Sequence, residues 1–339
     1  MFGAVISTVV LYSRWKKDYV QREMIEHNRI QNENRRLELQ ELSKRREALG
    51  SRLATAINHL SSTNGFTQVA GLIELGGLAD DWWNLGIAYG AVPDREGKIT
   101  AAEGAKEYQD ITLEEVQQRR QEIVTLIFCH KLPKATESDS IGDEDRQEMV
   151  QRARADLLRR HTDNLQDGPK LSEPSPESWC HFNLDGAWLK DAELIGVYLM
   201  ETSLIGANLQ NVNLISANLQ GACLSNANIQ GACLFSANLK DSYLLNTNLL
   251  GANLQGADLQ NANLQGANLQ NTNLQNSYLS RADFRDADLQ NTNLQNSYLS
   301  RADFRDAVYS DTTTFPKNFE PDEHGLVINP SERSGSAKN

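Results

Sequence analysis

From Leu184 to Phe304, every fifth residue is large and apolar, without interruption over 25 repeats. The residue two places before each of them is nearly always small, and the other three are mostly polar. An α-helix advances about 100° per residue, so a five-residue period would carry these side chains around all sides of it. In a straight strand, an odd period would place successive apolar residues on opposite faces. The pattern therefore predicts a chain that turns a corner every five residues.

A letter-for-letter duplication gives the number of sides in one turn. Residues 269–287 and 289–307 share the sequence LQNTNLQNSYLSRADFRDA. The offset between the two copies equals four five-residue sides, so duplicating one whole coil keeps every stacked contact in register. We therefore expect a four-sided β-solenoid over residues 179–310. Its expected core contains one large apolar residue per coil on each side; on the first side these are Leu184, Leu204, Leu224, Leu244, Leu264, Phe284 and Phe304.

The repeat unit, as in Ala252-Asn253-Leu254-Gln255-Gly256, resembles the motif A-[DN]-L-x-x of the pentapeptide-repeat family. The resemblance covers about 130 residues and implies a right-handed quadrilateral β-helix. No coil of such a repeat buries its own apolar side, so stacked neighbours supply the core. With the helical patterns upstream, the expected fold class is α+β and multidomain, an α-helical region followed by this β-helix.

The N-terminus begins with an apolar segment, residues 1–12, followed by an arginine, a tryptophan and two lysines at 14–17. The apolar segment is shorter than the roughly 20 residues that span a bilayer. The Trp and basic residues are typical of the cytoplasmic edge of a membrane helix. One interpretation is the end of a membrane helix that starts outside this chain, and the other is a helix start that packs on protein. We favour membrane association through residues 1–17 and thus a cytoplasmic, membrane-associated protein.

Residues 13–60 are rich in Arg, Glu, Gln and Leu and contain no proline, which predicts one long charged helix. Its apolar residues hold no sustained heptad, which favours a solvated spacer helix over a coiled coil. Residues 61–132 predict a small helical domain. Parts of it resemble the segment that precedes the repeats in a bacterial subgroup of the family, often behind a membrane helix and a charged spacer. That resemblance implies an interaction module without known catalysis.

Residues 133–178 are expected to form a linker that contains one charged helix, at residues 144–164. We expect this helix to cap the first coil, because exposed strand edges invite aggregation. Residues 311–339 are expected to form a C-terminal cap and a disordered tail, with Phe315 and Phe319 covering the last coil.

Two aromatic pairs are candidate partner-binding residues. Trp82 and Trp83 are adjacent in the helical region, where the alternative is one buried and one half-exposed ring. Tyr278 and Tyr298 are separated by four five-residue sides, so we expect them to stack on one face of the solenoid. The duplication alone would also explain this tyrosine pair.

Composition and spacing point away from catalysis. No convergent catalytic set, cofactor-binding loop or metal-ligand spacing occurs, so we expect no enzyme activity, no cofactor and no metal. Cys223 and Cys233 are separated by two five-residue sides and would lie on opposite sides of a coil, too far apart for a disulfide. The net charge is −12, with +4 over residues 1–60 and −5 over residues 181–310. This acidic balance argues against direct nucleic-acid binding.

Two functions follow. The leading hypothesis is a nonenzymatic scaffold that binds a protein, with tethering of the N-terminus to the cytoplasmic face of a membrane. The alternative is an acidic rod that mimics DNA, because similar family members that protect DNA gyrase from quinolones are acidic rods. Members of the family are abundant in bacteria, especially in cyanobacteria. The sequence identifies neither the partner nor the oligomeric state.

Overall fold

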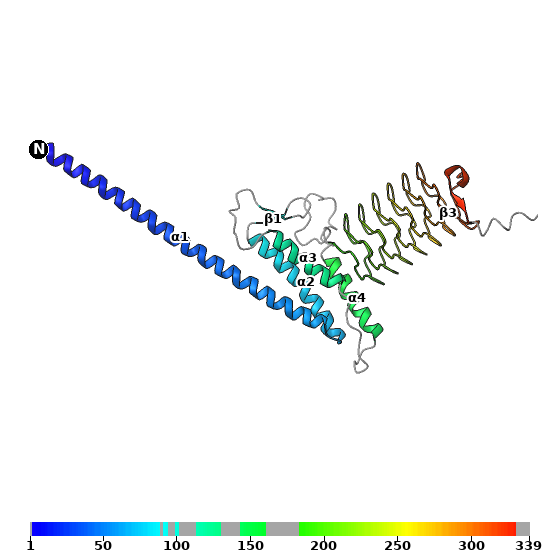
Figure 1. Ribbon diagram of the computed structural model, residues 1–339, viewed down its shortest axis with the longest axis horizontal. Coiled ribbons are helices and arrows are strands. Elements are labelled where there is room, and N and C mark those ends of the chain that lie inside the picture. The colour runs from blue at the N-terminus through cyan, green and yellow to red at the C-terminus, as the bar shows by residue number, and fades with distance from the viewer. Residues whose placement is uncertain are drawn as a thin grey trace, which may run out of the picture. The chain divides into compact units, whose positions relative to one another are not determined.

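The computed structural model describes residues 2–88, 91–93, 99–101, 113–129, 143–160 and 183–329. The chain divides into two compact units, Met1–Ala54 and Thr55–Asn339. Its elements are labelled in Figure 1 and are, in order, α1 (Phe2–Leu60), α2 (Gly65–Ala88), β1 (Ala91–Pro93), β2 (Ile99–Ala101), α3 (Leu113–Cys129), α4 (Asp143–Arg160), β3 (Val308–Tyr309), the 3-10 helix η2 (Pro321–His324) and β4 (Val327–Ile328).

The first unit consists of helix α1 as far as Ala54, and most of its described side chains are solvent-exposed. Ion pairs one turn apart stabilise it, among them Arg36 with Glu33 at 2.8 Å. Among the described residues, no helix is long and apolar enough to cross a membrane. The predicted membrane segment, residues 1–12, is helical from Phe2, but its side chains lie outside the described residues.

The helical domain of the second unit is built around α2, which packs against both α3 and α4 (Figure 1). Two glycines of α2 allow close approaches. A Cβ added at Gly71 would lie 2.9 Å from the carbonyl oxygen of Ala56 in the last turns of α1, and one added at Gly76 would lie 2.6 Å from Leu157 Cδ2 of α4. The sequence analysis expected only helices here, so the antiparallel pair β1–β2 is an addition to it.

Two buried arginines connect the helices. Arg120 Nε of α3 donates to the carbonyl of Ala79 in α2 at 3.2 Å, and Arg154 Nε of α4 donates to the carbonyl of Ile127 in α3 at 2.6 Å. Burial lowers the pKa of both guanidinium groups to about 10, which still leaves them charged at neutral pH. These hydrogen bonds fix α3 between its neighbours, and α3 in turn contacts the solenoid.

The solenoid shows the four-sided period directly. On each five-residue side, one residue forms an isolated parallel bridge with its equivalent four sides later, from Asn183 with Ser203 to Asp288 with Val308. In each five-residue side, the apolar residue donates its N–H to the following coil, as Leu209 does to Asn228 O at 2.7 Å. The residue before it donates to the preceding coil, as Asn208 does to Ala187 O at 2.8 Å. Each inner coil is therefore hydrogen-bonded on both edges, and only the two end coils have open edges (Figure 1).

The core of the solenoid consists of the apolar residue at every fifth position. All of these side chains from Leu184 to Phe304 are buried except Leu299, which is half-buried in the last coil. The Phe284 and Phe304 rings stack with centroids 4.8 Å apart. On the side described above, the buried residues are Leu184, Leu204, Leu224, Leu244, Leu264, Phe284 and Phe304.

The corners of the solenoid require a left-handed backbone two residues after each core residue. Both Asn246 (φ 53°) and Gly251 (φ 68°) have this conformation, and so does the corresponding residue at most other sides. Glycine and asparagine tolerate it, whereas most L-residues lose roughly 1–2 kcal/mol there. This explains why glycine, asparagine and aspartate are frequent at this position. The exceptions are Glu201 (φ 55°), Ser216 and Ser236 (both φ 54°), and Arg281 and Arg301 (both φ 62°).

Substitutions at one corner test this explanation. Gly251 has open space around its Cα, so a new Cβ meets no neighbour within 4 Å. We expect Gly251→Val to destabilise the solenoid by about 2 kcal/mol, because a β-branched residue is strained at positive φ. Gly251→Asn is the matched control and should cost less than about 0.5 kcal/mol. Thermal melting of both variants measures the difference, and equal melting temperatures would contradict the backbone explanation.

The last coil is covered by the C-terminal segment. Strand β4 pairs in parallel with β3, and Gly325 O accepts a hydrogen bond from the Asp306 N–H at 3.0 Å. The Phe319 ring packs edge-on against the Phe304 ring, with centroids 5.5 Å apart. These contacts shield the end of the core and pair part of the open edge.

Candidate partner-binding surfaces

Helix α3 closes one side of the first coil, residues 183–202. The Asn183 backbone would bond to a preceding coil if there were one. Instead, Gln121 Oε1 accepts from Asn183 N at 3.0 Å, and Gln121 Nε2 donates to Asn183 O at 2.8 Å. One side-chain amide thus replaces the peptide group of a neighbouring strand.

The C-terminal end of α3 closes the next stretch of this edge. An α-helix leaves its last four carbonyls without intrahelical partners. Phe128 O uses this capacity to accept from Trp188 N at 2.8 Å, and Cys129 Sγ donates to Asp185 O at 3.2 Å. Burial raises the pKa of the Cys129 thiol, which keeps it protonated as a donor. The sequence analysis assigned the cap to residues 144–164, whereas α3 makes these hydrogen bonds because its end reaches the open edge.

Loss of the Gln121 amide should loosen this edge. We expect Gln121→Ala to lower stability by about 1 kcal/mol and to speed amide exchange at Asn183 by about tenfold, since both hydrogen bonds of that residue's backbone are lost. Gln118 lies on the same helix and is exposed, with a hydrogen bond to Glu122, so Gln118→Ala should change neither quantity. Unchanged exchange at Asn183 in Gln121→Ala would contradict the capping role.

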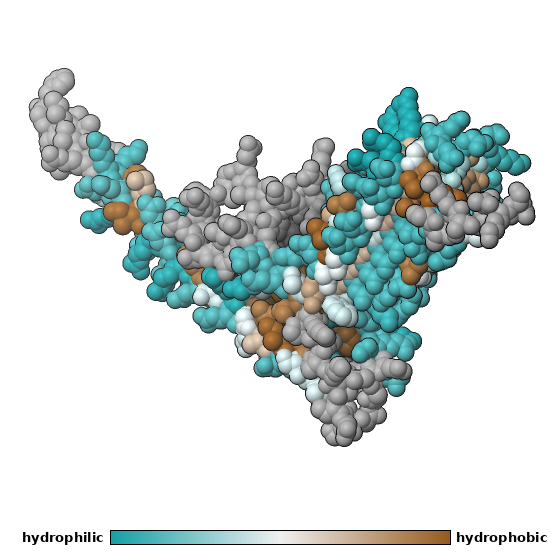
Figure 2. All heavy atoms as spheres, turned by 45° about the vertical axis from the view of Figure 1, so that its right-hand side comes forward, coloured by the Kyte–Doolittle hydropathy of each residue, from teal (hydrophilic) through white to brown (hydrophobic). Residues whose placement is uncertain are grey.

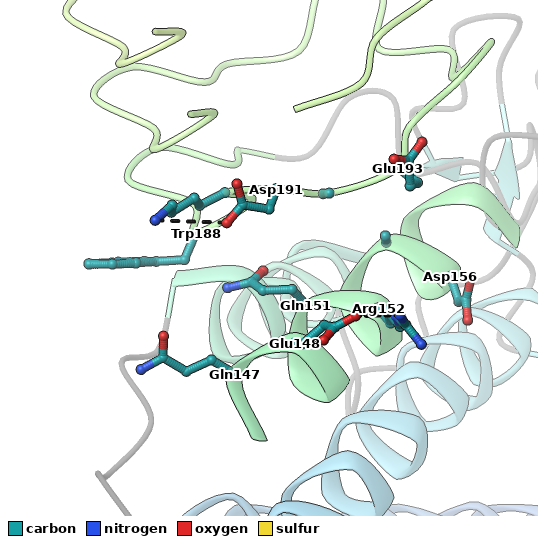
Figure 3. Close-up of a pocket in the computed structure, with 11 residues that line it drawn as sticks. Gln147, Glu148, Gln151, Arg152, Asp156, Trp188, Asp191 and Glu193 are labelled. Atoms are coloured by element: carbon teal, nitrogen blue, oxygen red, sulfur yellow. Dashed lines mark hydrogen bonds and ion pairs between the residues drawn. The ribbon is translucent and has the colours of Figure 1, made fainter. Parts of the chain in front are cut away.

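The remaining two sides of the first coil stay open. Glu193 N and Tyr198 N occupy the same repeat position as Asn183 N and Trp188 N, yet neither has a partner among the described residues. In front of this edge, α4 and the first coil enclose a cleft of about 790 Å³ (Figure 3). It is lined by Gln147, Glu148, Gln151, Arg152, Ala155 and Asp156 of α4 and by Trp188, Lys190, Asp191, Ala192 and Glu193 of the first coil.

The cleft is polar, and its walls carry both charges. Arg152 pairs with Glu148 on α4, and Lys190 Nζ lies 3.8 Å from Asp191 Oδ2 on the coil. Gln151 points from α4 toward the coil in Figure 3, and its buried Oε1 has no hydrogen-bond partner among the described residues. A buried acceptor without a partner is costly, but this oxygen has almost no accessible surface, so an occupant reaches it only after the Gln151 amide turns toward the cleft.

An exposed apolar column begins on the next open side of the solenoid, just after the cleft. Ile195 lies two positions after Glu193, and Ile215 and Phe235 follow it at the same place in the next two coils. Ile195 is 51 % exposed, Phe235 is 42 % exposed and Ile215 is half-buried. The same column continues as glutamine in the next three coils, at 255, 275 and 295. On the face drawn in Figure 2, the solenoid surface is mostly hydrophilic, with scattered hydrophobic areas. Apolar residues at a polar repeat position were a sequence signal, but the sequence analysis did not single them out.

Known proteins place the chain in a family. The family model "Pentapeptide repeats" matches in eight copies over residues 192–231, 232–271 and 267–306. The chain is 32 % identical to HetL, a pentapeptide repeat protein involved in heterocyst differentiation regulation from the cyanobacterium Nostoc sp. strain PCC 7120. The match covers 38 % of this chain and 68 % of HetL, with a TM-score of 0.25. The chain belongs to the pentapeptide-repeat family.

Two further pentapeptide-repeat structures are similar. The protein alr5209 from Nostoc PCC 7120 is 30 % identical over 39 % of this chain and 84 % of its own, with a TM-score of 0.18. QnrB1, a plasmid-mediated fluoroquinolone resistance protein, is 18 % identical over 45 % of this chain and 83 % of its own, with a TM-score of 0.20. Because all three TM-scores are low, membership rests on the repeat sequence. No curated protein matches the chain.

The aromatic residues that the sequence of this pentapeptide-repeat protein offered for partner binding differ in their exposure to solvent. Trp82 is 3 % exposed in the helical domain, so it does not form the surface that partner binding requires. The side chain of its neighbour Trp83 lies outside the described residues. Tyr278 and Tyr298 are exposed and stack with centroids 5.1 Å apart and planes 6° apart. Their stacking follows from the four-sided period, and partner binding there stays a prediction.

Charged residues of the duplicated coils pair locally. Arg285 donates to Asp283 in its own coil, with Nη2 2.6 Å from Asp283 Oδ2, and lies 3.8 Å from Asp303 in the next coil. Arg305 pairs with Asp303 in the same way. These hydrogen bonds hold the pKa of both carboxyl groups below the usual range of aspartate. Pairing is thus mainly within a coil, and it offsets the repulsion between stacked aspartates.

The described part of this pentapeptide-repeat protein contains neither a metal-binding cluster nor a disulfide. No group of three or more histidine, cysteine or acidic residues suited to a metal occurs among the described residues. Cys129, Cys223 and Cys233 are free thiols, and Cys180 lies outside the described residues.

Proposed function

We propose that the protein is a nonenzymatic interaction scaffold, in which a right-handed quadrilateral β-helix presents the side around its first three coils to a protein partner. The observation that carries this proposal is the exposed column Ile195–Ile215–Phe235, three apolar residues in register on a solenoid whose outward positions are mostly polar. Contiguous exposed apolar surface marks interaction sites in soluble proteins.

A comparison between coils at the same repeat position supports a binding role for this column. Folding does not require apolar residues in this column, because three later coils carry glutamine at the same place. Burial of a large apolar side chain stabilises a complex by roughly 1.5–3 kcal/mol. Three such residues in register therefore favour a partner, while they contribute little to the core.

Tethering of residues 1–17 to the cytoplasmic face of a membrane extends this proposal. Its support is the exposed Trp15 beside two lysines and the net charge of +4 over residues 1–60. Flotation of the full chain with vesicles tests it. We expect the chain to float with vesicles rich in anionic lipid, and the double variant Lys16→Glu with Lys17→Glu to remain in the soluble fraction.

DNA mimicry, the alternative, has the net charge of −5 over residues 181–310 as its support. The arginines at 285 and 305 neutralise two of the carboxylates by direct pairing, which weakens that support. A gyrase supercoiling assay with the full chain distinguishes the two functions. We expect no inhibition.

Site-specific photo-crosslinking tests the scaffold proposal. A benzoylphenylalanine placed at Ile215, in cells that produce the protein, should form a covalent adduct with another protein. The same probe at Gln275, three coils further along the same column, is the matched control and should form none. Equal adducts at both positions, or no adduct at either, would contradict the proposal.

A further inference from the structure

We infer that the open edge of the first coil docks an extended, basic peptide segment of a partner protein, which adds as a strand between this coil and α4. The inference rests on the proposed scaffold function and names the site and the partner class. It follows from two observations. Helix α3 pairs the backbone groups on one part of this edge, and the part that faces α4 keeps unpaired backbone groups beside a cleft.

The inner coils show which backbone groups of the open side need hydrogen-bond partners. Each inner side receives two N–H donors from the preceding coil and gives one N–H to it. On the side between residues 188 and 193, the corresponding groups are the carbonyls of Trp188 and Lys190 and the N–H of Glu193. None has a partner among the described residues. An extended peptide satisfies this pattern, as in the addition of strands to exposed sheet edges.

Space for such a strand exists beside residues 188–193 and not beside residues 183–188. Residues 183–188 contact α3 through direct hydrogen bonds. Residues 188–193 instead face the cleft of about 790 Å³, a size typical of binding pockets, which span roughly 300–1,000 Å³. Across it, the Gln151 side chain lies on the far wall (Figure 3), and its unpartnered, buried Oε1 becomes an acceptor for the strand once the amide turns toward the cleft. A strand could therefore be hydrogen-bonded from both walls.

The side chains around the cleft define the chemistry of the segment. On the coil wall, the lining contains the two carboxylates of Asp191 and Glu193 against the single cation Lys190. This balance favours a basic segment. Trp188 is 40 % exposed on the coil wall and offers its ring to an aliphatic stem or a cation. Ile195 lies outside this lining, two residues after Glu193, where it is placed to contact an apolar side chain at one end of the strand.

Peptide binding to the full chain tests the inference by fluorescence anisotropy. The probe is a labelled hexapeptide of alternating lysine and valine. A second peptide has the same side chains but carries N-methyl groups on the backbone amides of alternate residues. A third replaces lysine by glutamate. We expect binding of the first, and at least about tenfold weaker binding of the other two, because they lose the strand hydrogen bonds or the charge match.

Variants of the protein locate the bound peptide. Glu193→Lys should weaken binding of the lysine–valine peptide by about tenfold. Glu320→Lys makes the same charge change at an exposed position near the opposite end of the solenoid, and it should leave binding unchanged. Melting temperatures of both variants confirm that they are folded.

Several results would overturn the inference: no binding of the lysine–valine peptide, equal binding of its N-methylated form, or equal weakening by the two variants. A dimer of the free protein that Glu193→Lys dissociates would also overturn it, by assigning the edge to a second copy of the chain. If the crosslink at position 215 forms while these peptides fail, the scaffold function stands and only the docking site is wrong.

Discussion

Replacing Leu264 by lysine is expected to unfold the solenoid, whereas replacing the adjacent Gln265 by lysine should leave its stability nearly unchanged. Leu264 is fully buried, in register with Leu244 and Phe284 of the neighbouring coils. An unpaired charge at this depth costs several kcal/mol, and no acidic group lies among the described core residues of the solenoid to pair with it.

Gln265 is the matched control because its side chain points to the surface, where Nε2 donates to Asp286 Oδ2 at 3.1 Å. A lysine there retains an acidic neighbour, so the change in stability should stay within about 0.5 kcal/mol. Circular dichroism melting curves compare the two variants. Equal shifts in melting temperature would contradict the inward assignment of every fifth residue.

Deletion of residues 288–307 is expected to remove one coil and leave a folded, shorter solenoid. The deletion joins Ala287 to Val308 and thus restores the junction that Ala307 makes with Val308. Repeat stability is approximately a sum of unit and neighbour contributions, so the loss should equal one coil's share.

The C-terminal cap would meet the same residues after this deletion as before. It now contacts Phe304 through Phe319, Asp306 through Gly325, and Leu294 through Thr314. The residues at these positions one coil earlier are identical, namely Phe284, Asp286 and Leu274. Deletion of 290–307, which falls two residues short of a full coil, breaks this correspondence and should unfold the end of the solenoid. If far-UV circular dichroism and melting show equal damage from both deletions, four sides per coil is wrong.

The repeat region was predictable because each contact recurs with the same period. Once residues 269–287 and 289–307 fix the coil at four five-residue sides, the buried position and the neighbours of every side follow. The left-handed corners were also encoded, by the glycine, asparagine and aspartate residues that follow most core residues by two places, although the sequence analysis did not interpret them.

The junction with the helical domain was not predictable in the same way. Gln121 replaces a strand by two side-chain hydrogen bonds, and a glutamine on a charged helix carries no periodic signal of that role. The cleft depends on how far α4 stands from the first coil, which is determined by packing between distant segments. The sequence therefore indicated that a helix would cover the open edge, but not that α3 would pair it or that two sides would stay open.

Residue-resolved amide hydrogen exchange of the free, full-length protein tests the account most directly. Asn183, Trp188, Glu193 and Tyr198 occupy the same repeat position on the four sides of the first coil. The account predicts slow exchange at Asn183 and Trp188, which are bonded to α3, and fast exchange at Glu193 and Tyr198, which have no partner among the described residues. Slow exchange at all four amides would contradict it, because the edge would then already be closed.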